Sequence, residues 1–393
     1  MPTARGAAGE ELTVTLLTMG PGDEVWERFG HNALWIHDAS TGEDVVYNWG
    51  LFSFAEEGFL LRFLQGDMQY WMDGLSLEGT LHEYRSRNRS IWAQELSLTP
   101  QQRAELQEFV EWNRLPQNRY YRYDYFRDNC STRVRDALDL VLDGTLRRAG
   151  VEMGRGSYRW HARRLVQMDL VIDRGMHILM GPRGDAFLSR WEEAFVPMEL
   201  MELVATVSVP DENGGEVPLV RETRTLFEAE RPPEPRESPG FHLSFLAVGL
   251  TLAFLFPLLA GPGARTRRGV RVAHASLGAG WCLFCAFFGS IQALAWLWTD
   301  HVFMHANENL LQLSPLSLLL LPAVVAAAGW HRWMGVARGL ALVLVVGSAA
   351  GAVLKLIPGF VQVNMDVIAL ALPAHAGLAA SLFRAEDPRR GGF

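Results

Sequence analysis

The chain has 393 residues, of which 49% are hydrophobic and 20% are charged, and its formal net charge is −8. This average hides two unlike parts: 39 of the 44 acidic and 26 of the 36 basic residues precede Phe241, so the first part carries −13 and the rest +5. The long apolar runs after Phe241 exclude a wholly soluble enzyme, and the acidic balance excludes a nucleic-acid binder driven by net positive charge. The ample apolar and aromatic content excludes disorder.

Five strands are predicted in the first part of the chain, four of them before residue 100. Residues 12–18, 31–37 and 45–49 are short segments rich in β-branched and aromatic side chains. The polar turn DASTGED, which contains a glycine, joins the second segment to the third and predicts a hairpin. Residues 89–98 predict the fourth strand.

Three helices are predicted beside these strands. One begins after Thr99, a residue type that caps helices, and has Pro100 at its first position. A second begins at Cys130, directly after the extended, aromatic-rich segment RYYRYDYFRDNC. The third covers about 186–203 and is followed by a strand near 203–208. The apolar stripe of the second helix has helical spacing and consists of Val134, Leu138, Val141 and Leu142.

Five apolar segments near the C-terminus approach or reach the ~20 residues that a helix needs to cross the hydrocarbon core. They are residues 242–260, 277–298, 310–330, 336–357 and 362–383. Arginines follow the first, third and fifth segments, so the positive-inside rule places these connections and the C-terminus in the cytoplasm. These arginines are Arg265, Arg267, Arg268, Arg271, Arg332, Arg338, Arg384, Arg389 and Arg390.

The chain is therefore expected to have three parts. Residues 1–205 form an exported α+β domain, residues 206–240 a strand and a Pro-rich linker, and residues 241–393 a transmembrane domain of five helices. The N-terminal stretch MPTARGAAGEELTV has no apolar segment typical of a signal peptide. Because the orientation requires export of residues 1–240, we expect the true start or a cleaved signal to lie upstream.

Polar residues near the predicted spans have modest roles in this interpretation. Cys282 and Cys285 lie in an apolar run and are expected to be packing residues. The outer loop 298–309 places aromatic and hydrogen-bonding groups at headgroup level, on the side of the exported domain. We expect its polar groups, including Asn307 and Asn309, to contact a lipid headgroup or the exported domain. No metal site is assigned.

Cys130 is the one cysteine before Phe241, so it has no partner in that part of the chain for an intramolecular disulfide. Asp128 and Asn129 are able to cap the helix that Cys130 opens, which leaves the sulfur near free backbone N–H groups at the positive end of the helix dipole. This setting predicts a lowered thiol pKa and a nucleophilic thiolate. The alternative is a buried, unreactive cysteine.

A nucleophilic cysteine needs a base and a group that orients the base. His31 is favoured because it opens a strand directly after the Phe29–Gly30 turn, which exposes its ring at the end of the sheet. Asn48, on the paired strand, is able to accept from one imidazole nitrogen and leave the other facing Cys130. The other histidines before Phe241 are His37, His82, His161 and His177.

Three sequence words occur in the order ERFGHNALWI, VVYNWGLF and YRYDYFRDNCSTRVRD. Together they resemble the Lnb-type family, which has an N-terminal periplasmic domain and a membrane tail. That family resembles permuted papain-like folds of the NlpC/P60 and lecithin–retinol acyltransferase group, in which histidine-bearing strands precede the cysteine-bearing helix. In this resemblance His31 and Cys130 match the family's histidine and cysteine, and Asn48 takes the place of the third polar residue.

The resemblance implies a bacterial lipoprotein N-acyltransferase of the inner membrane that needs no cofactor. An acyl chain would move from a phospholipid, through a thioester on Cys130, to the N-terminal amine of a diacylglyceryl-cysteine lipoprotein. The alternatives are a papain-like cell-wall peptidase or amidase and a non-catalytic membrane sensor or transporter. Arg122, Arg127 and Arg133 are candidates for the donor phosphate, and the tyrosines before Cys130 either line an acyl path or pack. The expected substrate contacts are Tyr125, Asp128, Asn129, Arg133, Asn307 and Asn309.

Overall fold

The computed structural model describes residues 9–211, 215–261, 267–327 and 333–384. The chain divides into two compact units. Unit 1 consists of residues 1–168 and 186–238, and unit 2 of residues 169–185 and 239–393. Because each unit uses two separate stretches, the chain passes directly from one unit to the other three times.

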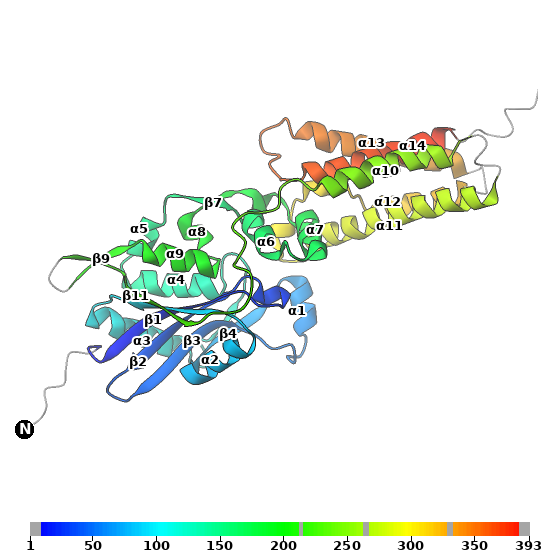
Figure 1. Ribbon diagram of the computed structural model, residues 1–393. Helices are drawn as coiled ribbons and strands as arrows, with labels where there is room; N and C mark the ends of the chain where they lie inside the picture. The colour runs from blue at the N-terminus through cyan, green and yellow to red at the C-terminus, as the bar shows by residue number, and fades with distance from the viewer. Residues whose placement is uncertain (1–8, 212–214, 262–266, 328–332, 385–393) are drawn as a thin grey trace, which may run out of the picture. The chain divides into compact units, whose positions relative to one another are not determined.

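Unit 1 is built on a seven-stranded antiparallel sheet (Figure 1). Its order is β11-β5-β1-β2-β3-β4-β6. The four strands predicted before residue 100 are confirmed as β1, β2, β3 and β5, and β2 pairs with β3 as the predicted hairpin. The strand predicted near 203–208 is wrong, because residues 203–205 are helical and the strand there begins at Ser208. The strands are β1 (Leu12–Met19), β2 (His31–Asp38), β3 (Glu43–Leu51), β4 (Gln69–Ser76), β5 (Ile91–Leu96), β6 (Tyr120–Arg122) and β11 (Val220–Phe227).

Helices cover both faces of this sheet, because successive residues of a strand point to opposite sides. Leu16 of β1 belongs to the core under α3, α4 and α9, whereas the next residue, Leu17, belongs to the core under α2. The predicted helix starts are confirmed: Thr99 caps α3 with Pro100 at its first position, and α4 begins at Cys130. The bounds are α2 (Leu77–Ser86), α3 (Pro100–Asn113), α4 (Cys130–Val141) and α9 (Pro197–Ala205).

Shorter elements complete unit 1. The prediction of one helix over 186–203 is wrong: a strand comes first, and the helical region is broken before Pro197, which opens α9. The two further antiparallel pairs are β7 with β8 and β9 with β10. The elements are η1 (Val25–Glu27), α1 (Phe59–Gln65), α5 (Thr145–Ala149), β7 (Met153–Ser157), α6 (Tyr158–Val166), η2 (Pro182–Asp185), β8 (Phe187–Ser189), α8 (Arg190–Glu193), β9 (Ser208–Pro210) and β10 (Glu216–Pro218).

The unit boundaries differ from the expected ones in two places. Residues 206–240 contain a strand, as expected, but they are part of unit 1 as far as Ser238, because β11 pairs with the outer edge of β5. This pairing covers an edge that would otherwise expose a row of unpaired N–H and C=O groups. Residues 169–185, which we expected in the exported domain, belong to unit 2.

Unit 2 is helical. Counted over the described residues, three helices are long and apolar enough to span a membrane: α11, α13 and α14. Helix α10 has 17 residues, and α12 is described only as far as Ala327, so the number of five spans stays a prediction. The bounds are α7 (Leu170–Leu179), α10 (Leu243–Leu259), α11 (Arg268–Trp298), η3 (Val302–Met304), η4 (Glu308–Leu311), α12 (Ser317–Ala327), α13 (Met334–Leu354) and α14 (Met365–Arg384).

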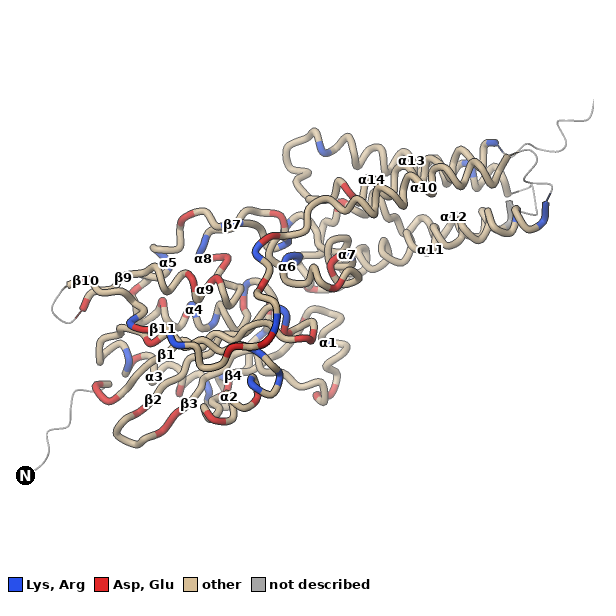
Figure 2. Tube along the Cα trace, viewed as in Figure 1, with Lys and Arg blue, Asp and Glu red and all other residues tan. Residues whose placement is uncertain are grey.

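Charged residues are frequent in unit 1 and sparse along the helices of unit 2 (Figure 2). Near the start of α13, Nε of Arg338 donates to the carbonyl oxygen of Leu382, close to the end of α14. Lys355 follows the opposite end of α13 and pairs with Glu308. Several arginines of the predicted orientation lie outside the described residues: Arg265, Arg332, Arg389 and Arg390.

Candidate active site

Asn129 fixes the start of α4. Its Oδ1 accepts hydrogen bonds from the backbone N–H groups of Ser131 and Thr132, each at 2.9 Å. Its Nδ2 donates to the carbonyl oxygens of Tyr125 and Phe195, at 2.9 Å and 3.0 Å. Every polar position of this buried amide is therefore occupied, which corrects the assignment of Asn129 as a substrate contact: it positions Cys130.

Replacing Asn129 by alanine is expected to destabilise the protein by about 1–2 kcal/mol, because the cap of α4 is lost. The melting temperature of the full chain in detergent measures this effect. Asn129→Ser is the control, since serine also caps helices and should retain part of the stability. An alanine variant that melts with the native protein would contradict the capping role.

Asp128 does not cap the helix. Its carboxylate receives two hydrogen bonds from Arg133, one to Oδ1 and one of 2.6 Å from Nη2 to Oδ2. The Arg133 guanidinium also lies 4.2 Å from the centre of the Tyr121 ring. The capping role predicted for Asp128 is therefore wrong, and the charge that we assigned to a donor phosphate is already paired within the protein.

Cys130 is a half-buried residue at the start of α4. Burial raises the pKa of the Cys130 thiol, while hydrogen bonds from the backbone N–H groups of Asn32, Ser131 and Cys130 itself oppose that rise. The prediction of a lowered pKa is corrected in sign, because burial outweighs the helix terminus. The same N–H groups nevertheless form a cluster of donors around the sulfur.

Two contacts hold this region together. The hydroxyl of Ser131 lies 2.8 Å from Oδ1 of Asn32 and 2.7 Å from the carbonyl oxygen of Ala194, which ties α4 to β2. Gly50 has a φ of +85°, and a Cβ at this position would lie 3.4 Å from Cβ of Cys130 and 3.5 Å from the Tyr123 ring. A glycine therefore lets β3 pass close to the thiol.

His31 and Asn48 are in contact. Nε2 of His31 lies 3.1 Å from Oδ1 of Asn48, whose Nδ2 donates to the carbonyl oxygen of Val46 at 2.9 Å. Because the amide already donates through Nδ2, its Oδ1 acts as acceptor, so the His31 proton sits on Nε2 and Nδ1 is left unprotonated. Burial lowers the pKa of His31 to about 4, so the imidazole is neutral at pH 7.

The structure also brings His31 close to Cys130 through the chain itself. Asn32, the residue after His31, supplies one of the N–H groups that face the sulfur. Within the described residues, the His31 ring bonds to Asn48, and no hydrogen bond joins it to the sulfur. Such contacts are often long before substrate binds. The candidate site thus contains a thiol, a neutral imidazole and an amide that bonds to the imidazole.

Tyr84 and Arg89 complete the surroundings of His31 and were missed by the sequence analysis. The rings of Tyr84 and His31 stack with their centres 6.3 Å apart, and the Arg89 guanidinium lies 4.7 Å from the centre of the Tyr84 ring. Arg89 is buried and donates through Nε to the carbonyl oxygen of Gly20. Its positive charge is a secondary cause that lowers the pKa of both His31 and Cys130.

Three of the other histidines, His37, His161 and His177, have partners of their own. His37 lies 2.9 Å from Asp44, at the far end of β2 from His31. His161 is buried, and its Nε2 lies 2.8 Å from a carboxylate oxygen of Glu193. His177 belongs to unit 2.

Asn307 and Asn309 lie in a buried polar network of unit 2. Both amides donate to the carbonyl oxygen of Ile178, at 3.2 Å and 2.9 Å. Oδ1 of Asn307 accepts from Gln362, and Oδ1 of Asn309 from Asn364, each at 2.8 Å. We expected these residues to contact a lipid headgroup or the exported domain. Ile178 lies in the range 1–205 that we assigned to that domain, but it belongs to unit 2, so the two asparagines join the end of α7 to two connections between helices of the same unit.

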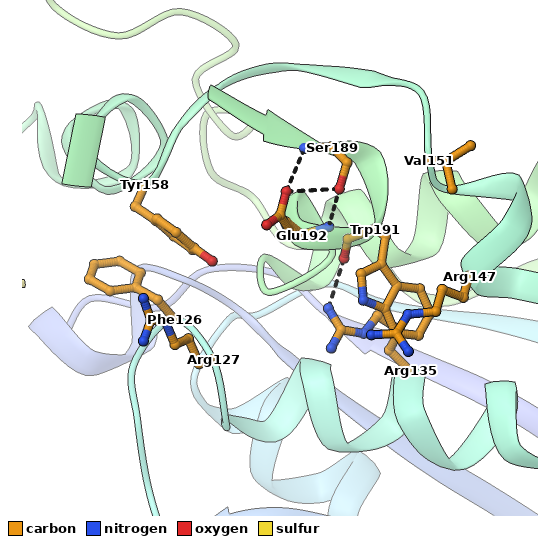
Figure 3. Close-up of a pocket in the computed structure, with 9 residues that line it drawn as sticks. All are labelled: Phe126, Arg127, Arg135, Arg147, Val151, Tyr158, Ser189, Trp191 and Glu192. Carbon is orange, nitrogen blue, oxygen red and sulfur yellow. Dashed lines mark hydrogen bonds between the residues drawn. The ribbon is translucent and has the colours of Figure 1, made fainter. Parts of the chain in front are cut away.

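Unit 1 has a separate pocket of about 510 Å³, and Trp191 is one of the residues that line it (Figure 3). The guanidinium groups of Arg135 and Arg147 lie 3.9 Å and 5.2 Å from the centre of the indole. Its lining includes none of Cys130, His31 and Asn48, so it is not part of the candidate site. The lining residues are Phe126, Arg127, Arg135, Arg147, Val151, Tyr158, Ser189, Trp191 and Glu192.

The comparison with protein families supports the resemblance noted from the sequence. Residues 4–166 match the model of the Lnb N-terminal periplasmic domain. The match includes His31, Asn48 and Cys130, and it ends within unit 1. No curated protein and no solved structure matches the chain. The matched domain and the three membrane-capable helices together indicate a membrane protein with a periplasmic domain.

Proposed function

We propose that this chain is a lipoprotein N-acyltransferase of the bacterial inner membrane. The observation that carries the proposal is the arrangement of Cys130, His31 and Asn48 in a periplasmic Lnb-type domain of a chain with membrane-capable helices. Both proposed substrates, a phospholipid and a diacylated lipoprotein, reside in a membrane. An enzyme that joins them therefore needs a catalytic domain held at a lipid surface.

In the first step, Nδ1 of His31 accepts the thiol proton as the sulfur of Cys130 attacks an ester carbonyl of the phospholipid. Negative charge develops on the former carbonyl oxygen, and the backbone N–H of Cys130, which is not one of the two N–H groups capped by Asn129, is the proposed donor to it. The ester C–O bond then breaks and His31 protonates the leaving alcohol. The products are a lysophospholipid and a thioester on Cys130.

In the second step, the N-terminal amine of the lipoprotein attacks the thioester carbonyl. His31 accepts a proton from the amine, and the C–S bond breaks. The thiolate that leaves recovers this proton from His31, so the enzyme returns to its neutral starting state. The acyl chain ends in an amide, and no cofactor takes part.

Asn48 supports this cycle by holding the His31 tautomer. Asn48→Ala is expected to lower the transfer rate about 10- to 100-fold, because the orienting hydrogen bond is lost from a buried site. A transfer rate measured over a range of pH tests this role, since the pKa of His31 should change as well as the rate. An unchanged rate and profile would exclude Asn48 from the site.

The proposed architecture is a permuted papain-like domain followed by five spans, with the C-terminus in the cytoplasm. In unit 1 the histidine strand β2 precedes the cysteine helix α4, which is the order of the permuted folds. Among the described residues, α11, α13 and α14 are long and apolar enough to span a membrane, which supports three of the five proposed spans. A reporter fused after Phe393 tests the orientation: a periplasmic signal there would contradict it.

The function is tested in cells depleted of their own lipoprotein N-acyltransferase. Expression of this chain should convert free lipoprotein N-termini to N-acylated ones, as measured by mass spectrometry. Persistence of the free amine, with the folded protein present in the membrane, would refute the proposal. Release of peptides from cell-wall fragments would support a peptidase instead.

A further inference from the structure

Exposed apolar side chains gather on α1 and on the two connections beside it. We call this group the apolar patch; its members are between 42% and 68% exposed. The aromatic members touch one another, since the Trp26 and Phe54 rings lie 5.4 Å apart and the Phe54 and Phe59 rings 5.2 Å apart. The patch consists of Val25, Trp26, Phe54, Leu60, Leu61 and Leu64.

Packing within the protein does not explain why helix α1 is so apolar. Its sequence is FLLRFLQ, in which five of the seven residues are apolar, yet none of the seven is buried. Gly58 and Gly66 bound the helix with positive φ values of 73° and 75°. Soluble proteins rarely leave such a group of large apolar side chains in water, and these groups commonly mark sites of contact with proteins or membranes.

Aromatic rings connect the patch to the candidate active site. Phe52, which contacts Trp26 and Phe54, stacks on Tyr70 with the ring centres 4.9 Å apart. Tyr70 stacks on Tyr123 at 4.3 Å. Tyr123 is the residue whose ring lies beside Gly50 near the thiol. A continuous row of rings thus leads from the exposed surface to Cys130.

The chain itself indicates what covers this surface. Unit 1 is joined directly to unit 2 at Met168, Asp185 and Ser238, and unit 2 carries α11, α13 and α14. A lipid surface is therefore always within reach of unit 1. The first 240 residues carry a charge of −13, so attraction to anionic headgroups does not favour contact. Apolar burial is the remaining driving force.

We propose that the apolar patch inserts into the lipid interface and that a phospholipid ester reaches Cys130 along the adjoining row of rings. The proposed insertion is argued only from the exposure of the apolar patch and from the chain connections between unit 1 and unit 2. The route of the ester also rests on the proposed acyltransferase function. Insertion driven by apolar burial should be insensitive to salt and should occur on zwitterionic lipid.

The insertion is tested with an environment-sensitive fluorophore on full-length protein in phosphatidylcholine vesicles. Leu61→Cys and Leu140→Cys are compared in a Cys130→Ala background, since these leucines lie on helices of unit 1 and are 61% and 60% exposed. The unsubstituted background corrects for labelling of Cys282 and Cys285. At position 61, emission should shift to shorter wavelength and be quenched by doxyl-labelled lipid, in low and in high salt. Behaviour like that of position 140 would refute the insertion.

The route of the ester is tested separately in the chain with its native cysteines. Leu61→Glu should lower acyl transfer from bilayer phospholipid roughly tenfold, since burial of a leucine is lost, whereas Leu140→Glu should not. Alkylation of Cys130 by iodoacetamide should be equal in both variants, which shows that the site is intact. Equal transfer in both would refute the route. If the patch inserts but neither the native chain nor any variant transfers an acyl chain, the acyltransferase proposal is refuted. The proposal that the patch docks on lipid is not affected by that result.

Discussion

Cys130→Ala is expected to abolish acyl transfer, lowering its rate by at least roughly 10³-fold, because the sulfur both attacks the phospholipid and carries the acyl group. No other group in the proposed cycle is able to form the thioester. Mass spectrometry of the intact chain after incubation with phospholipid should show an acyl adduct on the native protein and none on the variant. A non-catalytic sensor or transporter would keep its function through this change.

The control variants separate chemistry from folding. Cys130→Ser keeps the size of the side chain and the bonds of the neighbouring Asn129, so loss of the adduct in this variant cannot be ascribed to a cavity. Cys282→Ala removes a cysteine that is buried in α11 and should leave the adduct unchanged. An acyl adduct that survives Cys130→Ala, which leaves no nucleophilic side chain at position 130, would place the nucleophile elsewhere.

Local signals in the sequence were sufficient to predict the helices and strands of unit 1 that surround the candidate site. Two helix starts were predicted from capping residues: Thr99 followed by Pro100, and Asn129 followed by Cys130. Both predictions were correct because a cap interacts with N–H groups only a few residues away in the sequence. Enrichment in β-branched and aromatic residues located β1, β2 and β3. Pairing of β2 with β3 then brought His31 and Asn48 together, as two strands joined by a short turn must be neighbours.

Features that depend on distant parts of the chain were not predictable in this way. β11 completes the sheet edge by pairing with β5, more than 100 residues earlier, and nothing near Val220 marks that partner. The direction of the thiol pKa shift depends on burial by several segments, including β3 at Gly50. Arg89 lies in a segment, RSRNRS, that is typical of a solvated surface, yet its side chain is buried.

The pKa shifts predict that the resting site holds a neutral thiol and a neutral imidazole. Because the pKa of the Cys130 thiol is raised, its alkylation by iodoacetamide should accelerate as the pH rises through 9 and should show no plateau near neutrality. Subtraction of the rate for Cys130→Ser isolates this thiol. A plateau near neutral pH would instead reveal a preformed thiolate–imidazolium pair and contradict the neutral resting state.

His31→Ala is expected to lower the transfer rate about 10²- to 10⁴-fold, the usual contribution of a general base. In the native protein, transfer should fall at low pH with a midpoint near pH 4, since His31 becomes protonated there and no longer accepts the thiol proton. A midpoint near 6.5 would mean that burial does not hold the ring neutral. In His31→Ala the remaining activity should no longer show this fall in rate near pH 4. The matched control is His37→Ala on the same strand. His37 pairs with Asp44, so this variant should keep both the native transfer rate and the fall in rate near pH 4.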